Sequence, residues 1–450
     1  MSRLFGKEGI RGVAVTELTA ELCMQIGRAA AAVMEGNSGE KTRILIGKDT
    51  RSSSDTLEAA LCAGICSAGA DAELLGVVPA PALAYLIGVH EADGGIMITA
   101  AHVGAEFGGM KLFSSYGHRL SDEDEEEIER LVTVDPAELK PIPRRIYGNV
   151  IRCENAISEY LEHIKSLSSA DLSGMKIAVD CANGCASSTA KDIFTGMGAE
   201  VVLMGSSPDG TNINLDCGST HIDRLMEFVK ENECDCGLAF DGAAERCLAV
   251  DENGRLADGD ELIAICAKHM KDKGTLRHNT LVVTASNNLG LLHFARENGI
   301  YTVQAGSAGR YLHRKMLEGG FSIGGDPGGQ IIFPDDAPSA DGQLTGIKLL
   351  EILKESGGRM SQLTGVIKKL PQVMINVRIS PKDREIWKND RAITGLIDEF
   401  EEILGEDGRI IVREAGRSPV IRIMVEGEDF TTINTMAIQV ADTIKERCGQ

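Results

Sequence analysis

The sequence predicts an α/β fold: three related α/β domains followed by a smaller C-terminal α+β domain. Three observations favour this fold class. Short apolar strands that end in polar residues alternate with segments of helical period up to Pro371. Each such strand is followed, roughly 40 to 60 residues later, by a strand that runs into a distinctive loop, and this pairing occurs three times. Beyond Pro371 the pattern changes to alternating strands and amphipathic helices, which indicates an antiparallel sheet.

The composition is that of a globular chain, with 43% hydrophobic and 25% charged residues among 450. The formal net charge of −21 argues against nucleic acid or an anionic membrane as a partner. The N-terminus lacks a secretory apolar segment, and no apolar run is long enough to span a bilayer, so we expect a cytoplasmic protein. The twelve cysteines form no CxxC pair and are expected to be reduced core residues.

The first domain is predicted to cover residues 1–150. Two interpretations stay open for residues 1–12: a turn that leads into a helix, or a loop that carries Arg11 to a phosphate. Thr19 and Ser121 are suitable N-cap residues for two helices, the second of them strongly acidic. The remaining apolar and small-residue segments predict strands at 43–49, 72–78 and 96–98 and a helix at 56–69.

The other three domains are predicted at 151–255, 256–370 and 371–450, and a proline-rich stretch at 135–152 is expected to be a linker. In the second and third domains we expect strands that open at 175, 235 and 281 and helices at 155–167, 344–353 and 360–370. In the last domain we expect strands at 373–379, 409–413 and 420–425 and helices at 393–404 and 432–447.

Several motifs, in order along the whole chain, resemble those of the phosphohexomutases, most closely the bacterial phosphoglucosamine mutases. They are LFGKEGIRG, IGKDTR, GGIMITAAHVGAEFGGMK, VDCANG, SSPDGTNIN and CGSTH. The resemblance implies mixed sheets and four domains around a central cleft. It also implies one functional loop per domain: a phosphoserine loop, a Mg²⁺ loop, a sugar loop and a phosphate loop.

The phosphoserine loop of the family reads roughly S-A-S-H-N-P, and its second serine carries the transferred phosphoryl group. Here that position is Ala101, whose methyl group cannot carry phosphate, while His102 and Lys111 match the family. Thr99 has a hydroxyl two residues earlier, and His102 could accept a phosphoryl group in principle. We expect neither substitute to operate, so the loop is predicted to be inactive.

The metal loop of the family reads D-G-D-x-D-R and supplies three carboxylates to Mg²⁺. Here Asp241 is retained, Ala243 replaces the second ligand, and Glu245 replaces the third with a longer side chain. Because Mg²⁺ requires near-octahedral oxygen ligands, only a weak site is expected. We therefore predict no cofactor, with Mg²⁺ expected only if the protein is an active mutase.

The remaining two loops are also altered. The sugar loop of the family reads G-G-E-Q-S-G-H, and here Asp326 replaces the glutamate while Gly328 replaces the serine. The phosphate loop keeps arginines around a glycine turn, which suits bidentate binding of an anion, and the alternative of a structural turn with solvated arginines stays open. The residues predicted to bind phosphate are Arg413, Gly416, Arg417, Arg422 and Arg11.

These substitutions predict a phosphoglucosamine-mutase-like protein that lacks phosphoryl transfer and has a binding or regulatory role. We expect it to bind a phosphosugar or another small anion and to form a homodimer, or a heterodimer with a genuine mutase. The alternative is an active phosphoglucosamine mutase with atypical loops, which interconverts glucosamine 6-phosphate and glucosamine 1-phosphate. A third hypothesis, a different isomerase or phosphatase that uses His102 and Asp241, has no paired general acid and base to support it.

Overall fold

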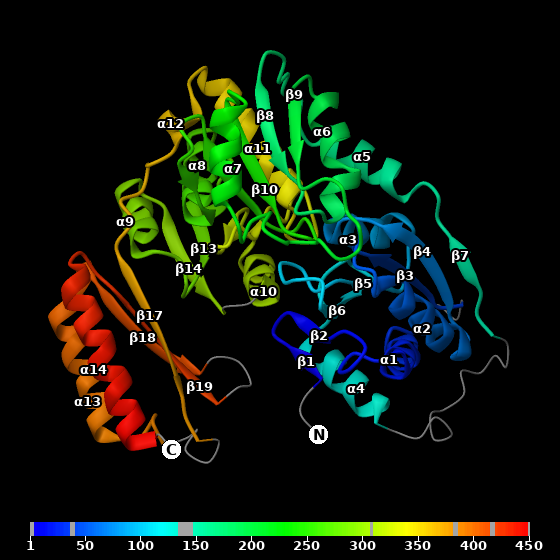
Figure 1. The fold of residues 1–450 in the computed structure, drawn as a ribbon, viewed down its shortest axis with the longest axis horizontal. Coiled ribbons are helices and arrows are strands. Elements are labelled where there is room, and N and C mark those ends of the chain that lie inside the picture. The colour runs from blue at the N-terminus through cyan, green and yellow to red at the C-terminus, as the bar shows by residue number, and fades with distance from the viewer. Residues whose placement is uncertain are drawn as a thin grey trace. The chain divides into compact units, whose positions relative to one another are not determined.

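The computed structural model describes residues 4–36, 41–133, 147–306, 309–380, 386–414 and 419–448. The contacts among these residues divide the chain into two compact units (Figure 1). The first unit comprises Met1–Asn287 and Asn298–Val366, and the second comprises Asn288–Glu297 and Ile367–Gln450.

The first unit opens with a seven-stranded mixed sheet in the order β1-β2-β6-β5-β3-β4-β7. Its strands are β1 (Phe5–Gly6), β2 (Gly9–Val13), β3 (Arg43–Lys48), β4 (Asp71–Val77), β5 (Gly94–Ile98), β6 (Phe107–Ser114) and β7 (Val150–Arg152). Its helices are α1 (Ala20–Val33), α2 (Ser54–Ser67), α3 (Ala80–Val89) and α4 (Asp122–Val132). Every residue of β5 is buried, as expected for a strand that pairs with β3 on one side and β6 on the other.

The local predictions hold in this domain except at two places. Thr19 and Ser121 cap α1 and α4, their side chains accepting the backbone N–H groups of Leu22 and Asp124. The first residues form the hairpin β1–β2, so Arg11 lies on a strand and not in a turn or loop, while its predicted role toward a phosphate stays a prediction. The predicted linker also ends in a strand: β7 pairs with β4 before the chain reaches the helix α5 (Ala156–Ser166) (Figure 1).

Two further sheets complete the first unit, with orders β12-β11-β10-β8-β9 and β14-β13-β15-β16. Their strands are β8 (Lys176–Asp180), β9 (Glu200–Met204), β10 (Cys236–Phe240), β11 (Cys247–Asp251), β12 (Leu256–Ala257), β13 (Thr280–Thr284), β14 (Tyr301–Ala305), β15 (Gly324–Gly325) and β16 (Ile331–Ile332). The helices are α5 (Ala156–Ser166), α6 (Ala190–Gly196), α7 (Asp223–Glu231), α8 (Gly259–Asp272), α10 (Gly309–Gly319), α11 (Gly342–Ser356) and α12 (Met360–Leu363). The helix predicted at 360–370 is therefore one turn long, and the positive φ of 77° at Gly365 follows its end.

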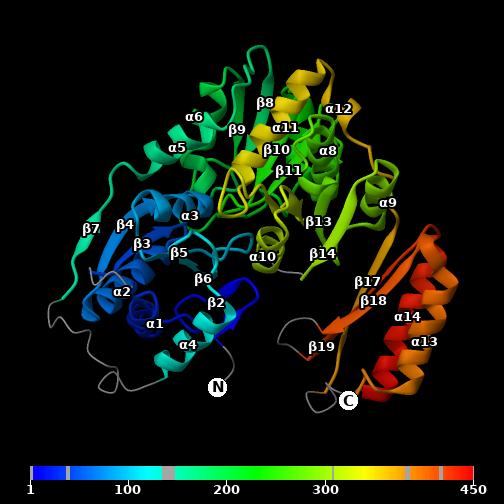
Figure 2. The ribbon, with the colours of Figure 1, turned by 180° about the vertical axis from the view of Figure 1, so that it is seen from behind.

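The second unit is an antiparallel sheet in the order β17-β19-β18, as the alternating pattern predicted. It contains β17 (Gln372–Arg378), β18 (Arg409–Glu414), β19 (Val420–Glu426), α9 (Leu289–Glu297), α13 (Arg391–Leu404) and α14 (Phe430–Cys448). Figure 2 shows α13 and α14 side by side against the sheet, where they enclose an apolar core. Helix α9 precedes the other elements of this unit in the sequence by about 75 residues but belongs to it. The Leu289 N–H of this helix donates to the Glu426 carboxylate at 2.8 Å.

The fold class predicted from the sequence is confirmed: three α/β regions with mixed sheets and a C-terminal α+β region. All twelve cysteines are free thiols, and most are buried. Among the described residues, none of the helices combines the length and apolarity needed to cross a bilayer.

Asp341, the N-cap of α11, is expected to make the stability of the first unit depend on pH. Its carboxylate accepts the N–H groups of Gln343 and Leu344 at 2.9 and 3.0 Å and the Tyr160 hydroxyl at 2.8 Å. Burial raises the pKa of Asp341 from 3.8 to about 6, so the folded state holds this proton more tightly than the unfolded chain does. The resulting stabilisation is fully present below pH 3.8 and is lost as the pH rises through 6.

The variant Asp341→Asn keeps an acceptor oxygen but has no charge to bury. Its unfolding temperature, relative to that of the wild-type protein, should therefore rise between about pH 4 and pH 7. Thermal unfolding across this range measures the difference. A difference that stays constant with pH would show that the Asp341 carboxyl does not titrate as its burial implies.

Candidate functional site

The candidate site begins where β5 ends and the chain turns before β6. Ala101 lies in this turn at a φ of 54°, a conformation that costs an alanine energy and that persists only where the surroundings impose it. Its N–H donates to the Thr99 hydroxyl at 2.9 Å. Thr99 is only 2% exposed, so this hydroxyl is committed inside the loop and is not presented to a substrate. The structure therefore offers a methyl group at the predicted carrier position, and the buried Thr99 hydroxyl does not replace it.

Asn214, from the SSPDGTNIN motif, joins this turn to the metal loop. Its side-chain amide donates to the carbonyls of Ala101 and Val103 at 2.8 and 2.9 Å and accepts the Gly242 N–H at 2.9 Å. The buried Arg51 guanidinium also donates to the Val103 carbonyl, at 2.5 Å. A β-carbon at position 242 would lie 2.8 Å from the Ala101 carbonyl oxygen, so only glycine permits this approach. The two loops are thus held together by hydrogen bonds within the protein.

Replacing Asn214 by alanine is expected to destabilise the first unit by about 2–4 kcal/mol, since three hydrogen bonds of about 0.5–1.5 kcal/mol each are lost. Asn214 also has a φ of 56°, which asparagine tolerates better than alanine. Chemical denaturation followed by circular dichroism measures the loss. Asn253→Ala, on an exposed turn, is the matched control and should change stability by less than about 0.5 kcal/mol.

The three positions predicted to bind metal do not form an octahedral donor set. One oxygen of Asp241 accepts the backbone N–H groups of Glu245 and Arg246 at 2.8 and 3.1 Å, and the other is buried without a hydrogen bond. Ala243 offers no ligand atom. The Glu245 carboxylate forms an ion pair with the Lys111 ammonium, and both residues are buried. Glu245 is thus balanced by a lysine ammonium, while the buried Asp241 oxygen without a hydrogen bond is a donor that a cation could use.

His102 faces the same region and is held in its neutral form. Burial, followed by the charges of Arg246, Arg11 and Lys111, lowers its pKa to about 3. The imidazole is therefore uncharged near neutral pH although it lies among cations. Lys111 and His102 thus lie in one region of the structure, and Arg11 contributes its charge from β2.

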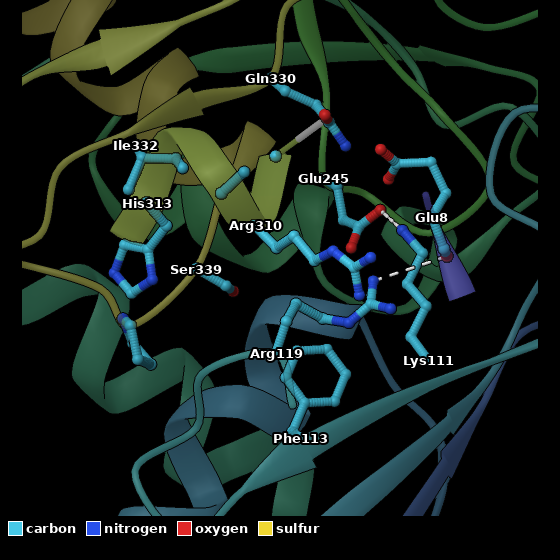
Figure 3. A pocket seen from close by; sticks show the side chains of 13 residues that line it. Glu8, Lys111, Phe113, Arg119, Glu245, Arg310, His313, Gln330, Ile332 and Ser339 are labelled. Atoms are coloured by element: carbon cyan, nitrogen blue, oxygen red, sulfur yellow. Dashed lines mark hydrogen bonds and ion pairs between the residues drawn. The ribbon is translucent and has the colours of Figure 1, made fainter. Parts of the chain in front are cut away.

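A small cavity of about 40 Å³ lies beside the Lys111–Glu245 pair, lined by residues from all three sheet regions of the first unit (Figure 3). Arg119 and Arg310 approach each other here, with Phe113 beneath Arg119. Glu125 and Asp122 pair with Arg310 at 2.5 and 2.8 Å, and Glu125 also lies 3.7 Å from Arg119. Both guanidinium groups keep buried N–H groups that make no hydrogen bond.

His313 adds another buried ring nitrogen without a hydrogen bond to the same cavity. The Nε of Arg246, the residue that follows Glu245, is also buried without a hydrogen bond. Sequence reasoning did not select Arg119, Arg310 or His313, since no motif marks them and only the tertiary fold assembles them. Arg246 could have been found, because it ends the quoted metal motif. The arrangement can bind an anion through several N–H donors at once.

The predicted sugar loop adjoins the metal loop through a β-bridge between Arg246 and Gln330. Burial raises the pKa of Asp326, although the nearby Arg246 charge opposes this shift. A β-carbon at Gly328 would lie 3.5 Å from the Arg246 guanidinium carbon, so the glycine borders that charge. Asp326 and Gly328 are therefore near a cationic residue of the metal loop.

The predicted phosphate residues of the last domain lie in the second unit. Arg413 on β18 and Arg422 on β19 are directly opposed in the strand register. Burial, followed by the Arg422 charge, lowers the pKa of Arg413. The Arg422 Nε donates to the Asn376 side chain at 3.0 Å. Gly416 and Arg417 lie outside the described residues.

Comparison with known families matches four consecutive parts of the chain. The matching family is described as Phosphoglucomutase/phosphomannomutase. Its alpha/beta/alpha domain I matches residues 2–137, domain II residues 158–254 and domain III residues 258–370, and its C-terminal domain matches residues 374–443. The placement of the predicted domain boundaries stays a prediction.

Full-length relatives and solved structures resemble the chain as well. A phosphoglucosamine mutase of Clostridium novyi is 45% identical over 450 residues and one of Acetivibrio thermocellus 43% over 449, each comparison covering all of both chains. A phosphoglucomutase/phosphomannomutase family protein of Burkholderia thailandensis has a TM-score of 0.84 at 22% identity, covering 99% of this chain and 98% of that one.

An N-acetylphosphoglucosamine mutase of Aspergillus fumigatus, solved with GlcNAc-6P and magnesium, has a TM-score of 0.71 at 15% identity. The match covers 99% of this chain and 96% of the Aspergillus chain, and at this identity the likeness concerns the fold alone. The fold, the four family matches and the full-length identity agree, and the chain therefore belongs to the α-D-phosphohexomutase family, among proteins of the phosphoglucosamine mutase type.

Proposed function

We propose that this protein binds amino-sugar phosphates with the phosphate group at the arginines of the cavity in Figure 3, whose volume of about 40 Å³ leaves the sugar outside it. The N–H groups of Arg119 and Arg310 that make no hydrogen bond support a phosphate as the anionic part. The names of the full-length relatives support glucosamine phosphate as the sugar part. A phosphate bound there would give these buried donors the hydrogen bonds that they do not make within the protein.

We further propose that binding is not followed by the family's serine-based phosphoryl transfer. The observation that carries this proposal is Ala101, whose buried methyl group occupies the carrier position. The Lys111–Glu245 ion pair also supports it, because the Glu245 carboxylate is paired within the protein at a position where the family supplies a metal ligand. The role would then be binding or regulation. Self-association, or association with a genuine mutase, stays a prediction that light scattering can measure.

The second candidate function is an active phosphoglucosamine mutase. The names of the relatives support this activity better than its loss. His102 also favours it: its pKa of about 3 keeps the imidazole neutral and nucleophilic, and Arg11, Arg246 and Lys111 could offset phosphoryl charge. In this case N–P bond formation on His102 would accompany cleavage of the phosphate ester, with the leaving sugar oxygen taking a proton.

One set of measurements separates the two functions. Glucosamine 6-phosphate should raise the unfolding temperature equally with and without Mg²⁺, because a ligand that binds the native state stabilises it. After incubation with a hexosamine bisphosphate, the intact mass should be unchanged and no glucosamine 1-phosphate should form. A protein heavier by one phosphoryl group, with turnover abolished in His102→Ala, would establish the mutase instead. Absence of any ligand-induced shift would contradict both.

A further inference from the structure

A second polar cluster lies outside the cavity of Figure 3, where the first sheet region meets the helix that follows it. His90 at the end of α3, Cys153 just after β7 and Glu159 on α5 each present one ligand atom, and these atoms all lie within 4.8 Å of one another. Across the described ranges of the chain, this is the one group of three or more His, Cys, Asp or Glu side chains with such a spacing. None of the three lines the cavity of Figure 3.

The contacts of His90 resemble those of a metal-binding imidazole. Its Nε2 lies 2.8 Å from a Glu159 carboxylate oxygen, and its Nδ1 lies 3.8 Å from one oxygen of Glu73 on β4. The other oxygen of Glu73 is buried without a hydrogen bond. A histidine that binds a metal through one nitrogen characteristically donates its other N–H to a carboxylate, which fixes the ring. Glu73 lies 3.8 Å from Nδ1, an ion-pair distance, and would have to move closer by several tenths of an ångström to accept this N–H.

The backbone holds these side chains in position. The Cys153 N–H donates to the Leu74 carbonyl at 2.9 Å and thereby continues the pairing of β7 with β4. Tyr85 on α3 stacks on His163 of α5, with ring centroids 3.7 Å apart and an interplanar angle of 7°. The His90 and Glu159 side chains are 15% and 33% exposed, so an ion can reach them from solvent.

We propose that His90, Cys153 and Glu159 bind a divalent transition-metal ion of the zinc class, with Glu73 orienting His90. An imidazole nitrogen, a thiolate and a carboxylate are the donor types that Zn²⁺ accepts, whereas Mg²⁺ and Ca²⁺ prefer oxygen alone. On binding, Cys153 releases its thiol proton to solvent, the imidazole carries its one proton on Nδ1 facing Glu73, and the His90–Glu159 hydrogen bond is exchanged for two metal bonds. The ion would join α3, β7 and α5, and so fasten the first sheet region to the second.

The full-length protein without an affinity tag tests this site, with Co²⁺ and Zn²⁺ as the probes. Wild-type protein should bind one equivalent of Co²⁺ with a near-ultraviolet thiolate-to-cobalt charge-transfer band, and Zn²⁺ should displace it. Cys153→Ser should abolish the band, and His90→Gln should lower Zn²⁺ affinity by more than tenfold in competition with a chromophoric chelator. Glu73→Gln should weaken binding by about 10- to 100-fold while keeping the thiolate band, as expected of an orienting carboxylate.

The matched controls are Cys66→Ser and His221→Gln, which change a half-buried cysteine and an exposed histidine away from the cluster and should bind like wild type. Zn²⁺ should also protect Cys153 from alkylation in the wild-type protein, a readout that needs no variant. The proposal is overturned if wild-type protein shows no thiolate band, if the band survives in Cys153→Ser, or if Zn²⁺ leaves the alkylation rate of Cys153 unchanged.

Discussion

Glu245→Leu is expected to lower the free energy of unfolding of the first unit by about 3–5 kcal/mol, because it leaves the buried Lys111 ammonium without its partner. Lys111 is 2% exposed and Glu245 7%, so water cannot solvate the remaining charge in the folded state. Chemical denaturation followed by far-ultraviolet circular dichroism measures the change. Fluorescence is a poor probe here, since the single tryptophan, Trp387, lies in the second unit.

The double variant Lys111→Met/Glu245→Leu is the control for lost packing. It removes both charges and keeps apolar groups of similar length, so it should recover most of the stability. If the single and double variants are equally unstable, the ion pair is not the source of the effect. Such a result would also remove the support that this ion pair gives to the loss of a metal ligand at Glu245.

Ala101→Ser/Ala243→Asp/Glu245→Asp should convert the protein into one that carries phosphate. The variant restores the family's serine and its three carboxylates, and the shorter aspartate side chain at position 245 would be freed from the ion pair with Lys111. Incubation with Mg²⁺ and a hexosamine bisphosphate should add one phosphoryl group, detected by intact mass. Turnover should exceed that of wild type by at least ~100-fold, because metal ions contribute several kcal/mol and each 1.4 kcal/mol changes a rate about tenfold.

Ala101→Ser alone is the control, and it should remain unphosphorylated because the Lys111–Glu245 pair is still intact. Full activity is not expected even from the triple variant, since Asp326 and Gly328 still differ from the family's sugar loop. Phosphorylation of the single variant would show that the carboxylates of the metal loop are dispensable. No gain in the triple variant would place the defect elsewhere in the site.

The local sequence patterns predicted helices and strands well where residues close in the sequence determine the secondary structure. The Thr19 and Ser121 side chains cap their helices whatever packs against them, and the apolar run of β5 suits any strand paired on both sides. The local sequence patterns were misleading where pairing with a strand far away in the sequence determines the secondary structure. The hairpin that contains Arg11 depends on pairing with β6, and β7 on pairing with β4. The helix predicted beyond Leu363 ends early because the backbone turns at Gly365.

The sequence by itself determined the family and the missing hydroxyl at Ala101, since the order of the motifs and the identity of each side chain do not depend on how the chain folds. The tertiary structure alone decided that Glu245 pairs with Lys111, that Asn214 joins two loops, and that Arg119, Arg310 and His313 share a cavity. It also brought His90 and Cys153 within reach of Glu159. The physical reason is the same in each case: charge pairing and hydrogen bonding depend on distances of a few ångströms between residues far apart in the chain, and only packing sets those distances.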